Sequence, residues 1–536
     1  MIQSKVSGLQ NVPVILAILL AIALFLVMAL PLSAVDWTDS VRTHSGLVSG
    51  EGLEDGIRVF RGIPFAAPPL GDLRWRPPQE AAPWDEIRDA TEFGAVCPQP
   101  PTLAAMGGGT LPEFSEDCLF LNLWTPAQDP DEALPVMVWI HGGGLSLGYS
   151  NQEIYDGVGF AKHGIVLVSI NYRLGPLGFL AHPELSAESA DGASGNYGFL
   201  DQLAALEWVQ KNIAAFGGDP DTVTIFGESA GGTSVFALLT SPMSEGLFHR
   251  AIAESPWVTE TNVTYQSKAT PFVASGEAQG VEFARLLVGE DADASLPALR
   301  AFDADEMIKK GGFSPFINVD RWFMPEAPET TFAAGRQRNV PLIVGTNANE
   351  GTMFMAAFIQ SVESYEKALD ETYGDQSKAV LAMYPAALKE DLAKAADRFI
   401  TDAWFLRPGR AMLRATSKVS SPGYQYHFTR ASRAIPAWGA HHAAELGYVF
   451  NTYAGFGPQV DPNAEDLELG ATMIDYWSQF AKTGDPNGNG RPHWPAHEPG
   501  SEAYLELGDT IRSGTKLRKA ACDALDGIIA KAHAAL

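Results

Sequence analysis

The sequence predicts an α/β fold, with a large, mostly parallel central sheet flanked by helices and enlarged by helical insertions. Strand-like and helix-like segments alternate along the chain, which favours a parallel sheet covered by helices. Short apolar runs at 136–140, 223–226 and 342–344 each end in a glycine-rich or polar turn, as buried strands do. At 536 residues, 46% of them hydrophobic, the chain can bury a sizeable core.

One large domain accounts for nearly all of this length. No internal repeat or long low-complexity linker divides the chain, so we expect a single catalytic domain over 35–536. Segments 262–299 and 361–396 are rich in Glu, Ala and Lys and favour helices. These helices either cap a site or lie solvated on the surface.

The first 34 residues differ from the rest. Residues 12–32 are nearly all apolar, and Leu32-Ser33-Ala34 ends in the small residues that suit a signal peptidase. The sequence therefore predicts a signal peptide over 1–34 and an exported protein, periplasmic or secreted. The alternative is an uncleaved membrane anchor, because the apolar run is long enough to span a bilayer.

A glycine-rich loop follows the first of the apolar runs. His141-Gly142-Gly143-Gly144 comes directly after the strand-like segment 136–140. Glycines let a backbone approach a substrate closely and aim its N–H groups at a developing oxyanion. We assign this role to Gly143 and Gly144; the alternative is a flexible turn.

The second apolar run leads into the most informative motif. Gly227-Glu228-Ser229-Ala230-Gly231 lies between the strand-like segment 223–226 and the helix-like segment 232–239. A G-x-S-x-G sequence at a strand-to-helix turn is a nucleophile elbow, which exposes the serine hydroxyl. The Ala230 N–H would join the two glycine donors.

A nucleophilic serine needs a base and an acid that orients the base. Glu350 follows the strand-like segment 342–344 and is the candidate acid, although a solvated loop carboxylate is the alternative. The candidate base lies in the pair His441-His442, which spacing alone does not resolve. An ordinary histidine pKa predicts that activity falls as the pH drops through about 6 to 7.

From about Val41 to about Leu507 the chain resembles the type-B carboxylesterase family of the α/β-hydrolases. This family includes para-nitrobenzyl esterases, animal carboxylesterases and cholinesterases. The resemblance rests on the glycine-rich loop, the elbow and a series of ordered blocks at 60–69, 115–122, 171–175, 195–198, 216–220 and 483–487.

The resemblance assigns the triad. It places the nucleophile on Ser229, the acid on Glu350 and the base on His442 rather than His441. The reason for the last choice is that the family histidine precedes a glutamate by three positions, which Glu445 satisfies. It also implies the oxyanion donors Gly143, Gly144 and Ala230.

The resemblance further implies supporting residues and a disulfide. Glu228 and Ser255 match positions whose side chains support the triad. Cys97 and Cys118 match a disulfide pair, which an exported protein can form. The third cysteine, Cys522, has no evident partner.

Departures from the family pattern bear on substrate choice. Pro256-Trp257 follows Ser255 where the family usually has glycine, close to the acyl pocket. Segment 98–117 lacks the tryptophan that stacks on choline in cholinesterases, so choline esters are not the expected substrates. Candidate pocket walls, each alternatively a core residue, are Trp257, Phe323, Phe354 and Phe405.

Together these features predict a serine carboxylesterase that forms an acyl-enzyme on small to medium neutral esters. The same triad could cleave amides, carbamates, polyesters or toxin esters, and a non-catalytic binding member of the fold is a further alternative. No metal or organic cofactor is implied. The net charge of −27 disfavours nucleic acid as a partner, no protein partner is implied, and a membrane enters only if residues 1–34 are retained.

Overall fold

The computed structural model describes residues 40–534 except 107–108, 271, 290–293, 387–388 and 489. The predicted signal peptide lies outside the described residues. Among the helices that are described, none has the length and apolar character needed to cross a membrane.

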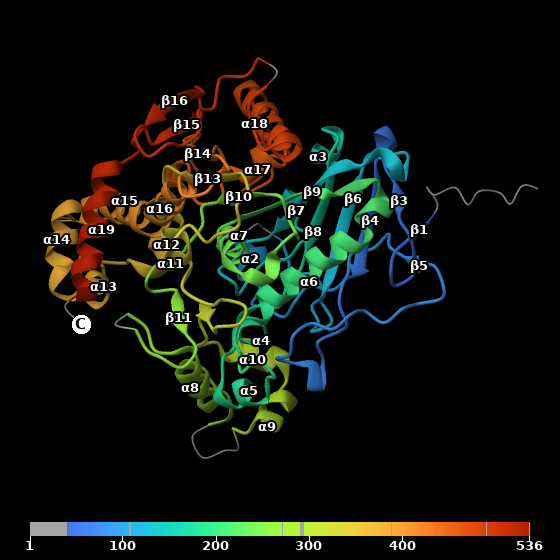
Figure 1. Cartoon of the computed structure of the whole chain (residues 1–536). Coiled ribbons are helices and arrows are strands. Elements are labelled where there is room, and N and C mark those ends of the chain that lie inside the picture. The colour runs from blue at the N-terminus through green and yellow to red at the C-terminus, as the bar shows by residue number, and fades with distance from the viewer. Residues whose placement is uncertain are drawn as a thin grey trace, which may run out of the picture.

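A twisted central sheet runs through the molecule (Figure 1). The strands from β8 to β15 in spatial order are parallel, and antiparallel strands complete both edges. The mostly parallel sheet predicted from the sequence is thus confirmed. In the described part of the chain its order is β16 (Arg512–Thr515), β15 (Ala503–Leu507), β14 (Gly423–Phe428), β13 (Leu342–Asn347), β10 (Arg250–Glu254), β9 (Gly218–Glu228), β7 (Leu134–Ile140), β8 (Val166–Ile170), β6 (Phe120–Thr125), β4 (Arg58–Pro64) and β3 (Glu51–Gly52).

The central strands are apolar along their whole length because both faces of the sheet are covered. In β7, Val136 and Val138 pack into the core on one face, while Met137 and Trp139 pack into the core on the other. All four side chains are fully buried. Helices α6, α7, α11 and α16 cover the first face, and α3, α17 and α18 cover the second. Their bounds are α3 (Val158–Lys162), α6 (Tyr197–Asn212), α7 (Ala230–Thr240), α11 (Pro328–Ala333), α16 (Arg407–Thr416), α17 (Leu446–Val449) and α18 (Ala464–Thr483).

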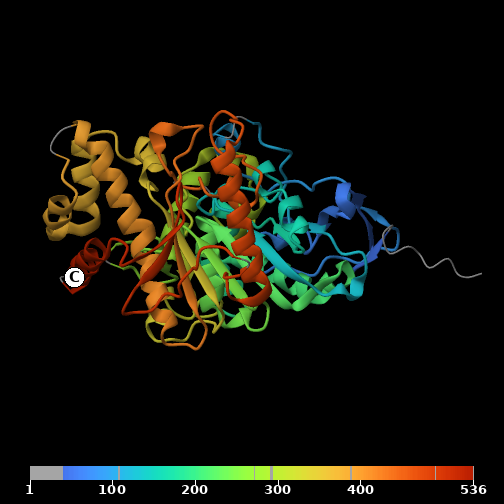
Figure 2. The same cartoon turned by 90° about the horizontal axis from the view of Figure 1, so that it is seen from above.

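Further helices form the predicted insertions. Segment 361–396 contains α13, α14 and the first part of α15, whereas segment 262–299 begins with β11 (Val263–Tyr265), which pairs with β12 (Ile317–Val319), before its helices start. A separate small core joins α13, α14, α15 and α19, which gather at the side opposite the N-terminal strands (Figures 1 and 2). The insertion helices are α8 (Gly276–Val288), α9 (Leu296–Ala301), α10 (Ala304–Lys310), α12 (Gly351–Phe358), α13 (Val362–Tyr373), α14 (Ser377–Met383), α15 (Lys389–Ile400) and α19 (Lys519–Ala534).

Short elements complete the description. A small sheet near the N-terminus joins β1, β2 and β5. The remaining elements are β1 (Val41–Arg42), β2 (Leu47–Ser49), β5 (Arg88–Asp89), α2 (Thr102–Met106), α4 (Gly175–Phe179) and α5 (Pro183–Glu188).

Candidate active site

Ser229 occupies a sharp turn between β9 and α7. Its backbone is strained, with φ 58° and ψ −119°, a region that non-glycine residues rarely adopt. The Ser229 N–H donates to the Glu254 carbonyl at 2.9 Å, and the Ser229 carbonyl accepts from the Thr233 N–H at 2.8 Å. The turn is therefore held from both sides, as a nucleophile elbow requires.

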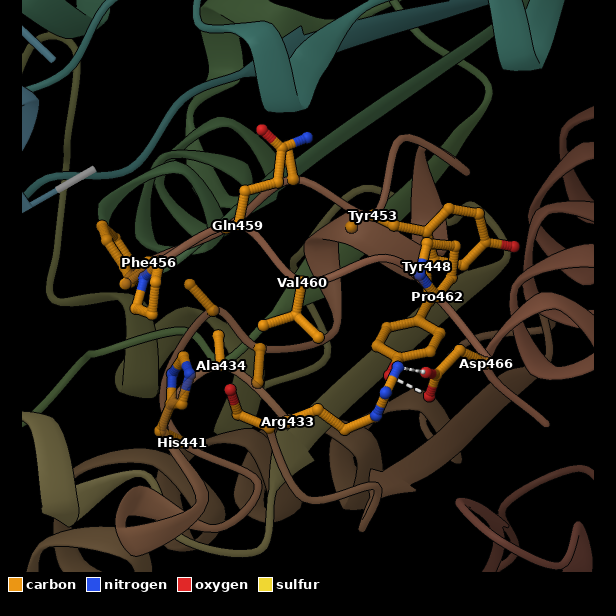
Figure 3. Close-up of a pocket in the computed structure, with 18 of the residues that line it drawn as sticks. Arg433, Ala434, His441, Tyr448, Tyr453, Phe456, Gln459, Val460, Pro462 and Asp466 are labelled. Atoms are coloured by element: carbon orange, nitrogen blue, oxygen red, sulfur yellow. Dashed lines mark hydrogen bonds and ion pairs between the residues drawn. The ribbon is translucent and has the colours of Figure 1, made fainter. Parts of the chain in front are cut away.

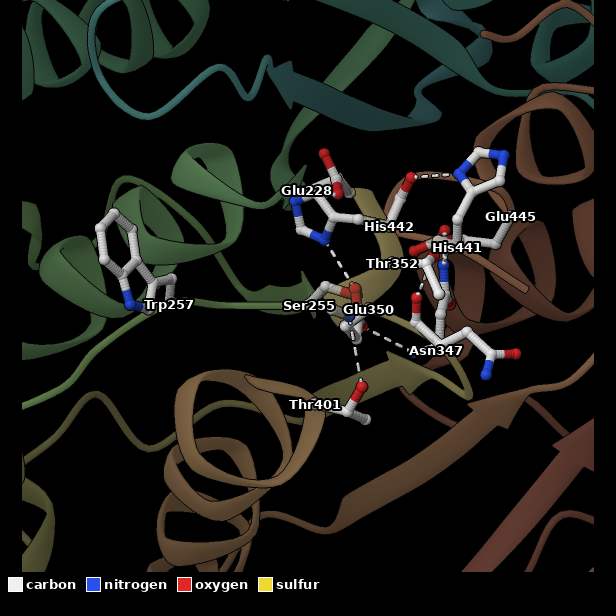
Figure 4. Close-up of polar contacts among 12 residues, drawn as sticks. Glu228, Ser255, Trp257, Asn347, Glu350, Thr352, Thr401, His441, His442 and Glu445 are labelled. Atoms are coloured by element: carbon white, nitrogen blue, oxygen red, sulfur yellow. Dashed lines mark hydrogen bonds and ion pairs between the residues drawn. The ribbon is translucent and has the colours of Figure 1, made fainter. Parts of the chain in front are cut away.

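A buried carboxylate holds the His442 imidazole (Figure 4). His442 Nδ1 lies 2.6 Å from Glu350 Oε2. The other oxygen, Glu350 Oε1, accepts from the Ser255 hydroxyl at 2.6 Å and from the Asn347 N–H at 2.7 Å. Because a carboxylate only accepts, Nδ1 carries the proton and Nε2 faces the elbow as a potential base.

The His441 imidazole points away from Glu350. Its Nδ1 lies 2.7 Å from the His442 carbonyl oxygen, and its carbonyl accepts from the Asn347 amide at 2.8 Å. Of the two imidazoles, only that of His442 contacts Glu350.

Glu228 contacts His442 directly, whereas the family resemblance implied only that it supports the triad. Its Oε1 is 3.1 Å from His442 Nε2, so the imidazole lies between two carboxylates (Figure 4). Among the described residues, neither of these two atoms has a well-aligned hydrogen-bond partner. Within the same residues, the Ser229 hydroxyl makes no hydrogen bond, and His442 Nε2 likewise has none.

Three buried glutamates, Glu228, Glu350 and Glu445, raise the pKa of this imidazole. Burial lowers the pKa of His442, but the negative charges of Glu228 and Glu350 outweigh it and raise the pKa to about 9. Burial raises the pKa of Glu228 and that of Glu445, and the positive charge of His442 opposes this rise in both. Burial also raises the pKa of Glu254, whose Oε1 accepts from the Trp477 indole at 2.8 Å.

The glycine-rich loop packs directly against the elbow. Gly143 has φ +108°, and a Cβ there would lie 2.3 Å from the Leu147 carbonyl oxygen. A Cβ on Gly142 would lie 3.1 Å from Ser229 Cβ. Within the described residues, the N–H groups of Gly143, Gly144 and Ala230 have no protein acceptor. These three groups are therefore free to bind an oxyanion.

Aromatic rings form a wall beside His442. Phe354 and Phe405 contact its ring, with centroids 5.0 and 4.8 Å away. Trp404 continues the wall, 5.9 Å from Phe354, and stacks on Trp257 at 5.6 Å. Trp404 and Phe405 lie in the π-helical turn η8 (Thr401–Leu406). Sequence reasoning missed Trp404, because no sequence pattern announces a π-helical turn.

One predicted wall residue lies elsewhere. Phe323 is fully buried in the main core, where it stacks on Phe199 at 5.5 Å and its carbonyl accepts from the Ser241 hydroxyl. It is a core residue, which was the stated alternative. The other three candidates, Trp257, Phe354 and Phe405, are part of the aromatic wall.

The predicted disulfide between Cys97 and Cys118 is present. The Gln99 side chain, two residues from Cys97, binds Gly148 twice: it donates to the Gly148 carbonyl at 2.8 Å and accepts from its N–H at 2.7 Å. The disulfide loop is thereby joined to the glycine-rich segment. No cluster of three or more metal-ligating side chains occurs among the described residues.

Comparison with known proteins gives a consistent result. The sequence profile of the Carboxylesterase family matches residues 38–525. The fumonisin B1 esterase of Sphingopyxis macrogoltabida is 39% identical over 502 residues, covering 89% of this chain and 87% of its own. The para-nitrobenzyl esterase of Bacillus subtilis (strain 168) is 36% identical over 482 residues, covering 88% and 95%.

Solved structures agree. A pNB esterase structure matches with a TM-score of 0.79 and 34% identity, covering 91% of this chain and 99% of its own. A thermophilic pNB esterase matches with a TM-score of 0.80 and 33% identity, covering 91% and 100%. Because the profile, the relatives and the structures each match nearly the whole described chain, this protein belongs to the carboxylesterase family and is a carboxylic ester hydrolase.

Proposed function

We propose that the chain is a serine esterase that works through Ser229, His442 and Glu350. Ser229 attacks the ester carbonyl while His442 Nε2 accepts its proton, which gives a tetrahedral intermediate. This intermediate expels the alcohol, which takes the proton from His442, and water then hydrolyses the acyl-enzyme that remains. The N–H groups of Gly143, Gly144 and Ala230 stabilise the oxyanion. The observation that carries this proposal is the 2.6 Å contact between Glu350 and His442 beside the strained serine turn.

Glu228 has a defined part in this mechanism. The imidazole becomes positively charged when it takes the serine proton, and a carboxylate 3.1 Å from Nε2 stabilises that charge. In the substrate-free protein the same carboxylate raises the pKa of the ring. Proton transfer from Ser229 therefore requires a small shift of the ring or of Glu228, so that Nε2 faces the hydroxyl.

The aromatic wall limits the acyl group. Trp257, Trp404 and Phe354 form a continuous set of contacts that reaches His442. Large rigid rings leave little room on that side, so we assign small to medium neutral esters as substrates. A second candidate is fumonisin B1, because the fumonisin B1 esterase named above is 39% identical over 89% of this chain.

A para-nitrophenyl ester series from acetyl to decanoyl tests the proposal, using residues 35–536. We expect turnover that peaks at short chains, and a transient acyl adduct on the peptide that contains Ser229, detected by mass spectrometry after acid quench. An adduct on another residue, or folded protein without turnover, contradicts the mechanism. Fumonisin B1 is assayed in parallel, with hydrolysis products detected by mass spectrometry.

Trp257→Ala is expected to change acyl preference. Removing the indole opens the wall where it stacks on Trp404, so the decanoyl-to-acetyl ratio of kcat/KM should rise by at least about tenfold, since each accommodated methylene contributes about 1–3 kcal/mol. Trp322→Ala, at a half-buried tryptophan outside the wall, is the matched control. An unchanged ratio in Trp257→Ala removes Trp257 from the acyl site.

The pH profile tests the contact between Glu228 and His442. A protonated ring cannot accept the serine proton, so kcat/KM falls as the pH falls through the pKa of His442. Because neighbouring carboxylates raise that pKa to about 9, the fall should begin above the range of about 6 to 7 that an ordinary histidine gives.

Glu228→Gln removes the carboxylate that raises the pKa of His442 most. The fall in kcat/KM, the acid limb of the pH profile, should therefore move to lower pH by about 1 to 3 units. Glu468→Gln, at an exposed position of α18, is the control and should leave the limb in place. A limb that is unchanged in Glu228→Gln contradicts the electrostatic role given to Glu228.

Export completes the proposal. The leader directs the chain out of the cytoplasm and is removed after Ala34, and the Cys97–Cys118 disulfide supports an oxidising compartment. Intact-mass and N-terminal analysis of the native protein should find Val35 first, in the periplasmic or secreted fraction. Full-length protein in the membrane fraction would instead establish a retained anchor.

A further inference from the structure

A second cavity lies on the outer side of the catalytic histidine loop (Figure 3). Its volume is about 180 Å³, room for one aromatic ring, since a cavity of about 150 Å³ can hold benzene. It is lined by segments 430–434 after β14, 441–448 with α17 and 453–462 before α18, and by Glu153 and Asp466. In the described part of the chain, none of Ser229, Glu350 and His442 belongs to its lining.

His441 supplies the cavity with a hydrogen-bond acceptor. Its side chain is 2% exposed, and burial lowers its pKa, so the ring is neutral at physiological pH. The His442 carbonyl can only accept, so His441 Nδ1 carries the ring proton. His441 Nε2 therefore presents a lone pair, and it has no protein donor among the described residues. Figure 3 shows this ring at the cavity wall.

The lining holds two arginines and two carboxylates, Arg430, Arg433, Glu153 and Asp466, so its formal charges balance. Asp466 accepts from Arg430 at 2.9 Å, from Arg433 at 3.1 Å and from the Tyr448 hydroxyl at 2.9 Å. The cavity therefore favours the binding of a neutral ligand over that of an ion. Phe456, Pro462, Ala434 and Val460, a valine that is 36% exposed at the rim, form an apolar part of the wall beside polar side chains such as Ser432 and Gln459.

We propose that this cavity binds a small neutral aromatic alcohol, a phenol-like molecule. Its hydroxyl donates to His441 Nε2, and its ring packs against Phe456 and Val460. Figure 4 shows that His442 faces the glutamates while His441 points away from them.

The occupant would act on the catalytic loop through short links. His441 Nδ1 donates to the His442 carbonyl, and the Asn347 amide bonds both the His441 carbonyl and Glu445. Pinning the His441 ring therefore restrains the backbone that carries the base. A change in kcat at constant KM is expected, because the cavity does not overlap the substrate site.

Binding is tested by fluorine NMR titration of 4-fluorophenol into the purified enzyme. Val460→Trp fills the cavity, and His441→Phe removes the acceptor; each should weaken binding by at least about tenfold. Trp257→Ala reports on the acyl site and should leave the dissociation constant unchanged. Wild-type affinity in both cavity variants, or loss of binding in Trp257→Ala, overturns the proposal.

Kinetics test the coupling. Hydrolysis of ethyl butyrate, followed by pH-stat, releases no phenol, so added 4-fluorophenol should change kcat in the wild type and not in Val460→Trp. Binding without any change in kcat overturns the coupling.

Phenyl butyrate identifies the source of the ligand. A progress curve that bends as phenol accumulates in the wild type, and stays straight in Val460→Trp, supports the enzyme's own product as the ligand. A straight curve in both, with an effect of added 4-fluorophenol on ethyl butyrate hydrolysis, supports an aromatic alcohol from outside.

Discussion

Ser229→Ala is expected to lower kcat/KM for para-nitrophenyl butyrate by at least about 10⁴-fold, because the acyl-enzyme cannot form without the hydroxyl. The fold should persist, since the turn is held by backbone bonds from Ser229 to Glu254 and Thr233. Circular dichroism and thermal unfolding check the fold, and a stopped-flow assay checks the rate. Alanine also fits the backbone as well as serine does.

The matched control for this substitution is Ser234→Ala, one turn further along α7. Its hydroxyl donates to the Ala230 carbonyl and accepts from Gln202, away from His442. We expect activity within a few-fold of the wild type. If Ser229→Ala keeps more than a small fraction of the wild-type rate, the nucleophile lies elsewhere, and a covalent label from a fluorophosphonate would locate it.

Glu350→Gln is expected to have the next largest effect, a loss of about 10³- to 10⁴-fold in kcat. The amide oxygen can still accept from Ser255 and Asn347, so the side chain stays in place. Its NH₂ group then faces His442 Nδ1, which must accept instead of donate. The proton moves to Nε2, and the imidazole can no longer take the serine proton.

Two comparisons make the Glu350→Gln result specific. Glu445→Gln changes a carboxylate of the same buried group that does not contact His442, and its loss should be much smaller. Glu350→Asp keeps the charge with a shorter reach and should retain more activity than Glu350→Gln. If Glu350→Gln stays within tenfold of the wild type, Glu350 is not the orienting acid.

The sequence predicted those parts of the site that directly follow the carboxyl ends of parallel strands. Strands at 136–140, 223–226 and 342–344 each end at the same edge of the parallel sheet, so the residues that follow them meet there. That geometry brings the glycine loop and elbow together, as expected. The choice of His442 over His441 came from the family resemblance and agrees with the contact to Glu350.

Features that depend on side-chain packing were not predictable. The 3.1 Å approach of Glu228 to His442 depends on rotamers within a buried group of charges. Trp404 reaches the wall only because the helix widens at 401–406. The sequence does not indicate whether an aromatic residue such as Phe323 or Trp257 lies in the core or in the pocket wall. The contacts of the folded chain place Phe323 in the core and Trp257 in the wall.

Two hydrogen bonds between the Gln99 side chain and the Gly148 backbone link the Cys97–Cys118 disulfide loop to the glycine-rich loop. Gln99 lies two residues from Cys97, and Leu147, next to Gly148, donates its N–H to the Gly143 carbonyl at 2.9 Å. We therefore expect the redox state of these two cysteines to affect, through Gln99, the positions of the Gly143 and Gly144 N–H groups. Protein produced in a reducing cytoplasm can therefore be abundant and soluble and still be a poor catalyst.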